Sequence, residues 1–238
     1  MIQKILFLAI AFTLTACDQE QVVDDPAKTQ IEEYTKKLKI CEEEDGNKDY
    51  VRSLSVVSTD DIVIGDPKSK IVLVEYFAPT CPHCVHYHQK IFPEIKAKYI
   101  DTNKIAYVIR EFIGNKQDLD ATILARCSGH TDTYLKFLEV ILNQQNNWAF
   151  SKNYREILTN IGSLGGVSPE NFSTCLNDQN KIKILMENTK LVTNLPTFIG
   201  TPSFFTNGEQ FNEKYTFEEL SKAIDKELTI DKELTIDN

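Results

Sequence analysis

Two cysteines and three histidines lie within one short stretch, TCPHCVHYH, at residues 80–88. The cysteines are Cys81 and Cys84, and the histidines are His83, His86 and His88. Two cysteines at this spacing can form and break a disulfide, whereas cysteine and histidine together can also hold a metal such as zinc. The spacing alone permits both chemistries, so the flanking elements must decide between them.

Two apolar, β-branched runs flank the stretch and predict buried strands: KIVLVEYFA at residues 70–78 and KIAYVIREF at residues 104–112. Between them, residues 82–99 predict a helix, because Pro82 suits a first helical turn. Pro93 lies inside this helix and is expected to kink or split it. Strand, helix and strand in this order predict a βαβ unit with a parallel strand pair.

This order places Cys81 at the junction of strand and helix, where its sulfur faces unpaired N–H groups and the positive end of the helix dipole. Both lower the pKa of a thiol, and a partly cationic imidazole on His83 would stabilise the thiolate further. Cys84 follows one helical turn later and deeper in the protein. Because a stable thiolate stabilises the reduced form, the disulfide is expected to oxidise other proteins.

The metal alternative rests on Cys81, Cys84, His86 and His88 as four ligands. Zinc sites usually take a second ligand pair from elsewhere in the chain to complete a tetrahedron. On a helix Cys84 and His88 share a face, but His86 does not, so a compact ligand shell is hard to build. We therefore expect no metal in this stretch.

The second half of the chain predicts a helical block followed by a small β unit. Residues 117–192 show repeated helical periodicity, which interrupts the α/β pattern. Residues 201–211, TPSFFTNGEQF, predict a hairpin with an Asn-Gly turn, and Thr216 is a plausible cap for a closing amphipathic helix. We expect one domain over residues 50–228 and a frayed tail over residues 229–238.

The N-terminus predicts export. Residues 1–16 combine a positive start with a short apolar run, and they resemble a bacterial lipoprotein signal peptide that ends before a lipidated Cys17. An ordinary signal peptide with an incidental cysteine is the alternative. Asp18 favours retention at the inner membrane by analogy with other lipoproteins. Outside the cytosol disulfides persist, which bears on all six cysteines of the chain.

Residues 17–49 predict an acidic tether that contains a helix, with Ile31, Tyr34, Leu38 and Cys41 on one face. This helix is either a solvated stalk or an oligomerisation helix, in which Cys41 could cross-link two chains. The net charge of −9 argues against a nucleic-acid binder, which needs a basic face to neutralise phosphates.

Three features together carry a family resemblance: FAPTCPHC after a buried strand, TPSFF before a hairpin, and the helical block between them. Over residues 54–228 the chain resembles the DsbA-like thiol:disulfide oxidoreductases of the thioredoxin superfamily. The resemblance implies an α/β thioredoxin fold, with a helical domain inserted between the βαβ half and the C-terminal ββα half.

The resemblance also implies roles for individual residues. Pro202 would be a cis-proline that faces the redox pair, with Thr201 before it. Glu75 would lie beneath Cys84 and take its proton, whereas the alternative is a glutamate exposed at the sheet edge. The resemblance further suggests a structural disulfide between Cys127 and Cys175, two cysteines of the helical block. The alternative is that both are buried free thiols.

The expected function is an exported, membrane-tethered protein-disulfide oxidase of the periplasm, anchored to the inner membrane. Cys81 would form a mixed disulfide with an unfolded or cysteine-containing exported protein, and Cys84 would resolve it; no cofactor is needed. The family implies reoxidation by a quinone-linked membrane partner. The alternatives are a disulfide isomerase or reductase, oligomeric through the N-terminal helix, and a metal-binding periplasmic lipoprotein.

Overall fold

The computed structural model describes residues 57–236. The expected signal peptide, the lipidation site Cys17, the tether and Cys41 lie outside the described residues. Among the residues described, no helix is both long and apolar enough to span a bilayer.

A five-stranded mixed sheet in the order β1-β3-β2-β4-β5 forms the centre of the fold. Only β2 and β3 are parallel, and every other neighbouring pair is antiparallel. The strands are β1 (Ile62–Gly65), β2 (Val72–Phe77), β3 (Ala106–Glu111), β4 (Ser203–Thr206) and β5 (Glu209–Phe211). The predicted βαβ unit and hairpin are both present, and Asn207 and Gly208 form the hairpin turn with positive φ.

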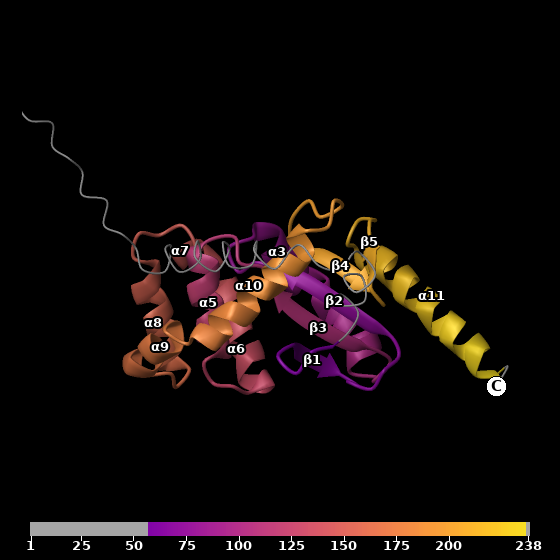
Figure 1. Cartoon of the computed structure of the whole chain (residues 1–238), viewed down its shortest axis with the longest axis horizontal. Coiled ribbons are helices and arrows are strands. Elements are labelled where there is room, and N and C mark those ends of the chain that lie inside the picture. The colour runs from indigo at the N-terminus through magenta and orange to yellow at the C-terminus, as the bar shows by residue number, and fades with distance from the viewer. Residues whose placement is uncertain (1–56, 237–238) are drawn as a thin grey trace, which may run out of the picture.

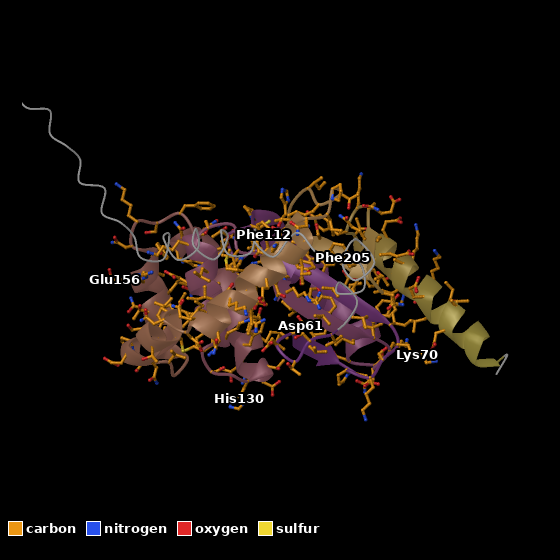
Figure 2. The ribbon with its side chains drawn as sticks, viewed as in Figure 1. Asp61, Lys70, Phe112, His130, Glu156 and Phe205 are labelled. Atoms are coloured by element: carbon orange, nitrogen blue, oxygen red, sulfur yellow. A yellow bond between two sulfur atoms is a disulfide. The ribbon has the colours of Figure 1, made fainter. Side chains whose placement is uncertain are left out.

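The sheet is buried on both faces, which explains why its central strands read as continuous apolar runs. Leu73, Glu75 and Phe77 of β2 alternate with Val74 and Tyr76, and all five are buried. The second face packs against the helical block, where Val74 and Phe205 join one apolar cluster with Val192; Figure 2 labels Phe205 at this position.

The helix that follows β2 is divided near Pro93, as the sequence predicted. It forms α3 (Pro82–Lys90) and α4 (Phe92–Ile95), and then one π-helical turn, η1 (Lys96–Ile100). Pro93 lies in the first turn of α4, where its missing N–H costs nothing.

The inserted helices gather at one end of the molecule, as Figure 1 shows. Some of these helices begin with side-chain caps: Ser168 accepts a hydrogen bond from the Asn171 N–H, and Asp178 accepts hydrogen bonds from the N–H groups of Asn180 and Lys181. The helices are α5 (Lys116–Arg126), α6 (Thr131–Asn143), α7 (Gln145–Trp148), α8 (Tyr154–Leu164), α9 (Pro169–Leu176) and α10 (Gln179–Thr193). This arrangement confirms the predicted α/β fold with a helical insertion.

Two parts of the fold differ from expectation. The sequence did not indicate the four-residue strand β1. Asp61, the residue before β1, forms a buried ion pair with Arg110 at 2.8 Å. Figure 2 labels Asp61. The frayed tail expected from residue 229 is instead the continuation of α11 (Phe217–Ile236). The repeat DKELTI contains no glycine or proline and is rich in helix formers, so nothing in it ends the helix.

Candidate active site

Cys81 and Cys84 lie where the central strand β2 turns into helix α3. Cys81 is the N-cap residue, with extended φ and ψ of −80° and 116°, and Pro82 follows in the first turn. Cys81 is partly exposed, whereas Cys84 is completely buried. The helix therefore presents one sulfur to solvent and holds the other one turn inside the protein.

The environment of Cys81 favours its thiolate. The pKa of this thiol is lowered to about 5, chiefly by a hydrogen bond from the Cys84 side chain. The side chain of Thr201 and the backbone N–H groups of His83 and Cys84 lower it further, against the opposing effect of burial. The expected helix-terminus effect is thus present, but His83 acts through its N–H, and its side chain is exposed.

Cys84 has the opposite character. Burial raises the pKa of its thiol well above the ordinary value. The hydrogen bond to Cys81 and the negative charges of Cys81 and Glu75 act in the same direction. At neutral pH the pair is therefore one thiolate and one thiol, which is the asymmetry that directed thiol–disulfide exchange requires.

The loop before β4 reaches the exposed sulfur. Sγ of Cys81 lies 3.1 Å from the backbone carbonyl oxygen of Thr201, to which it donates a hydrogen bond when it is protonated. The peptide bond between Thr201 and Pro202 is cis. Thr201 lies 120 positions away from Cys81 along the chain, so the fold brings this loop against the sulfur.

Glu75 is completely buried in β2, so the edge-exposed alternative is wrong. Its Oε1 lies 3.0 Å from Nε2 of His88, and its Oε2 accepts a 2.7 Å hydrogen bond from the Tyr107 hydroxyl. That hydroxyl in turn lies 3.0 Å from the hydroxyl of Tyr87, which is also buried. Glu75 therefore belongs to a buried group of hydrogen-bonded polar side chains near the redox pair.

Sequence reasoning placed His88 among candidate metal ligands and missed Tyr107. One signal was present for His88, because Cys84 and His88 are four residues apart and share a face of α3. For Tyr107 the signal lay in the strand register: it pairs with Leu73 across the parallel ladder, which places it on the same sheet face as Glu75.

A second group of polar side chains, all from the inserted helices or the loop before them, holds the turn that precedes Cys81. Asp118 Oδ1 accepts a 2.8 Å hydrogen bond from the Thr80 N–H, and Asn115 donates to the Thr80 hydroxyl at 3.1 Å. Gln145 donates to the carbonyl of Pro79 at 2.7 Å. Burial raises the pKa of Asp118 to about 6. No sequence pattern pointed to these residues, because each is an ordinary polar position within a helical block.

The comparisons with known proteins agree with this geometry. The family model described as thioredoxin matches residues 57–226. A Rickettsia prowazekii protein, which carries the provisional name protein-disulfide oxidoreductase, is 53% identical over 81% of this chain and 71% of its own length. The crystal structure of Wolbachia pipientis α-DsbA1 is 27% identical, with a TM-score of 0.69 over 75% of this chain and 96% of that one. The chain belongs to the DsbA-like family of the thioredoxin superfamily.

Further relatives extend the similarity without adding to the site. A Rickettsia conorii protein with the same provisional name is 57% identical over 71% of this chain and 61% of its own length. The match to that relative therefore spans less than two thirds of its length. Oxidised BdbD from Bacillus subtilis, at 18% identity and a TM-score of 0.63, shows the shared fold.

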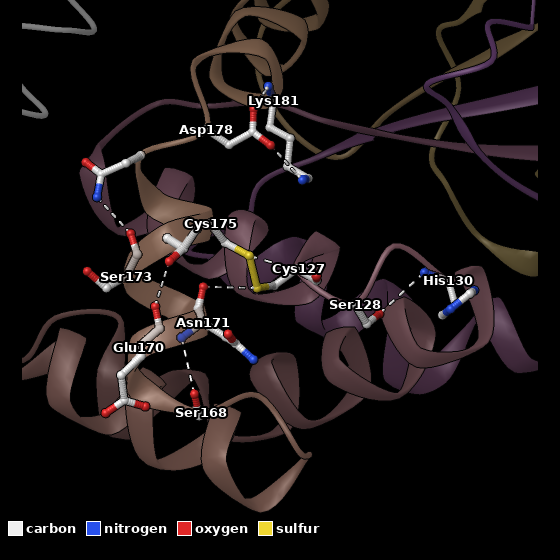
Figure 3. Close-up of a disulfide and its surroundings, with 12 residues drawn as sticks. Cys127, Ser128, His130, Ser168, Glu170, Asn171, Ser173, Cys175, Asp178 and Lys181 are labelled. Carbon is white, nitrogen blue, oxygen red and sulfur yellow. Dashed lines mark hydrogen bonds and ion pairs between the residues drawn. A yellow bond between two sulfur atoms is a disulfide. The ribbon is translucent and has the colours of Figure 1, made fainter.

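This DsbA-like chain also has a disulfide in its inserted helices. Cys127 at the end of α5 and Cys175 near the end of α9 are bonded, with an S–S distance of 2.00 Å and a Cα–Cα distance of 5.7 Å. Figure 3 shows the bond between the two helices, with Asn171 beside it. It joins residues 48 positions apart and lies in the insertion, away from the Cys81–Cys84 turn.

The metal alternative finds no support in the geometry. Within residues 57–236, no three or more His, Cys, Asp and Glu side chains are grouped to hold an ion. His86 is exposed on α3, whereas His88 faces the buried Glu75. The two histidines therefore point to different environments, as their spacing on a helix requires.

Proposed function

We propose that this protein is a protein-disulfide oxidase in which Cys81 and Cys84 are the redox pair. The observation that carries the proposal is the contrast between the two sulfurs, because the pKa of Cys81 is lowered to about 5 while that of Cys84 is raised. A stabilised Cys81 thiolate favours the reduced enzyme, and its disulfide then tends to accept electrons from other thiols.

The proposed reaction has two exchange steps. A substrate thiolate attacks Sγ of Cys81 in the Cys81–Cys84 disulfide; a new S–S bond forms, the enzyme's S–S bond breaks, and Cys84 leaves and takes up a proton. A second substrate thiolate then attacks the substrate sulfur of the mixed disulfide and releases Cys81 as a thiolate. The substrate loses two electrons and gains a disulfide, and the enzyme is reduced.

Three surrounding residues would support these steps. The carbonyl of Thr201, held before Pro202, lies where an extended substrate segment would approach Cys81. Glu75 is the buried carboxylate that would exchange a proton with Cys84, since its charge already influences that thiol. His83 would contribute its N–H to the Cys81 sulfur.

The cellular setting is part of the same proposal. The signal-like residues 1–16 support export, and Cys17 followed by Asp18 supports a lipid anchor at the inner membrane of the periplasm. Substrates would be unfolded or cysteine-containing exported proteins. Because each turnover leaves the enzyme reduced, a membrane partner linked to quinones would have to accept its electrons.

The reduction potential of the Cys81–Cys84 pair tests the proposal. The purified chain is equilibrated in glutathione buffers, and the trapped thiols are counted by mass spectrometry. We expect a value near −120 mV, which is roughly the reference value for DsbA itself, whereas about −270 mV would indicate a reductase. When mixed with a disulfide-containing peptide, the Cys84→Ser variant should accumulate a mixed disulfide, because the Cys81 thiolate attacks the peptide S–S bond and releases one peptide thiolate, whereas the Cys81→Ser variant should form none.

A further inference from the structure

A hydrogen-bonded pair, Glu75 and His88, leads from the buried carboxylate whose charge acts on Cys84 to a groove on another part of the surface. Glu75 has two hydrogen-bond partners among the described residues, His88 and Tyr107. Tyr107 is fully buried, and within residues 57–236 its hydroxyl continues to the buried hydroxyl of Tyr87. His88 is different, because 9% of its side chain is exposed while that of Glu75 is not exposed at all.

The exposed edge of His88 lies in a groove of about 630 Å³ between α3–α4 and α6. Apolar side chains line much of this groove, including Phe92, Leu135, Leu138 and Leu142. The imidazole itself is held among rings, with centroids 5.2 Å from Phe92 and 5.5 Å from Tyr87. Its orientation toward Glu75 is therefore fixed by packing as well as by the hydrogen bond.

The position of His88 relative to Cys84 follows from helix geometry. The two residues are four apart on α3, so their side chains share one face, and this face lies over Glu75. The buried thiol, the carboxylate and the imidazole thus stand in one cluster. Solvent reaches this cluster at the imidazole, while Cys84 and Glu75 are completely buried.

We propose that His88 is a positioning residue that also carries protons between Glu75 and the solvent in this groove. The inference rests on the proposed function, in which Cys84 must gain a proton each time its disulfide is opened. The proton passes from water to His88, from His88 to Glu75, and from Glu75 to the departing sulfur of Cys84. When the enzyme is reoxidised, Cys84 loses its proton along the same path.

Other titratable groups face this path and must be considered with it. Tyr87 and Tyr107 have pKa values raised well above the ordinary value by burial, so they stay neutral in the working pH range. The groove is also lined by Lys96, Asp132, Lys136 and Glu139. These four residues carry two charges of each sign, so they impose no strong net field on the imidazole.

The first test is kinetic. The disulfide form of the whole chain is mixed with a dithiol peptide at pH 5–8, quenched with acid, and the fraction reduced is measured by mass spectrometry. His88→Gln can keep a hydrogen bond to Glu75 but cannot titrate. We expect it to slow reduction about 10- to 100-fold, which is less than or equal to the loss expected for a direct general acid, and to change the dependence of the rate on pH.

His86→Gln is the matched control, because it makes the same substitution on the same helix at an exposed position. It should react like the wild type. If His88→Gln also reacts at the wild-type rate with the same pH profile, the inference is wrong. If the wild type itself does not oxidise the peptide, the proposed function fails instead, so the two failures are distinguishable.

Chemical rescue separates proton transfer from simple packing. In His88→Ala, imidazole added to the solution can enter through the groove and take the vacated place. Pyrazole has nearly the same shape but is far less basic. We expect imidazole to restore most of the lost rate and pyrazole to restore little; equal rescue by both rings would show that His88 only fills space, and would overturn the proposal.

Discussion

The thioredoxin half of the domain and the inserted helices both reach the redox turn, but with different groups. The thioredoxin half supplies both sulfurs, the buried Glu75 and the Thr201 carbonyl that precedes the cis peptide bond. The helical block, with the loop before it, supplies Asp118, Asn115 and Gln145, which bind the backbone and hydroxyl of residues 79 and 80. One half therefore sets the proton affinity of the sulfurs, and the other sets the position of the turn that carries them.

This difference teaches where changes should affect stability and where they should affect chemistry. A change deep in the helical block should alter the free energy of unfolding and leave thiol reactivity intact. A change in the thioredoxin half at the pair should alter reactivity. Only a change at the contact between the halves should alter both.

The disulfide of the helical block gives the largest expected change in stability. Replacing both Cys127 and Cys175 with serine removes a cross-link between residues 48 positions apart. We expect the free energy of unfolding to fall by about 2–4 kcal/mol, because the unfolded chain regains conformational freedom. Urea titration measures the loss. The rate of peptide oxidation should change less than about twofold; a tenfold loss would mean that the halves are not separable in this way.

The next largest expected effect is the difference between the alkylation rates of Cys81 and Cys84 in the reduced protein. With a pKa of about 5, Cys81 is almost entirely thiolate at pH 7, whereas the buried Cys84, whose pKa is raised well above 9.0, stays a thiol. Iodoacetamide should therefore label the partly exposed Cys81 well before the buried Cys84, although the lower nucleophilicity of a low-pKa thiolate offsets part of the gain. Labelling followed against pH should show a midpoint near 5, and a midpoint above 8 would contradict the assigned environment.

The same thiolate predicts how the stability of the reduced protein depends on pH. The pKa of Cys81 in the folded protein lies below its ordinary value of 9.0, so its contribution is fully present above pH 9 and is lost as the pH falls through about 5. The oxidised protein has no such group. The stability of the reduced form relative to the oxidised form should therefore decrease from pH 8 to pH 4, as paired urea titrations can measure.

Asp118 tests the contact between the halves. Asp118→Ala removes the acceptor of the Thr80 N–H, which is a hydrogen bond to a charged group worth roughly 1.5–3 kcal/mol. We expect amide exchange at Thr80 to accelerate about tenfold or more, and the pKa of Cys81 to shift because its turn is less well held. Asp132→Ala, on the exposed start of α6, is the control and should change neither.

The titration of Asp118 gives a smaller effect with a defined sign. Burial raises its pKa from 3.8 to about 6, so the folded protein binds this proton more tightly than the unfolded chain. The associated stability is present below pH 3.8 and is lost as the pH rises through about 6. Compared with the non-titrating Asp118→Asn, the wild type should gain relative stability on going from pH 7 to pH 4. An unchanged difference would show that Asp118 does not titrate in this range.

Local patterns in the sequence were sufficient for much of the fold and for the redox pair. The apolar runs around β2 and β3, the split at Pro93 and the Asn207-Gly208 turn each depend on neighbours within a few residues. Part of the lowering of the Cys81 pKa also followed from its place before a helix, because the N–H groups of His83 and Cys84 belong to the next residues in the chain, although the larger effect comes from the Cys84 side chain.

Tertiary structure alone decided the rest. The contacts concerned join residues that are 13 to 49 positions apart: Glu75 with His88 and Tyr107, Asp118 with the Thr80 N–H, and Asp61 before β1 with Arg110. His88 could be a metal ligand, a surface residue or a partner of Glu75 until packing placed it against that carboxylate and beside a groove. The sequence by itself determined which residues could do redox chemistry; which of them share a buried, low-dielectric site depended on how sheet and helices pack, and this controls where protons and charges are stable.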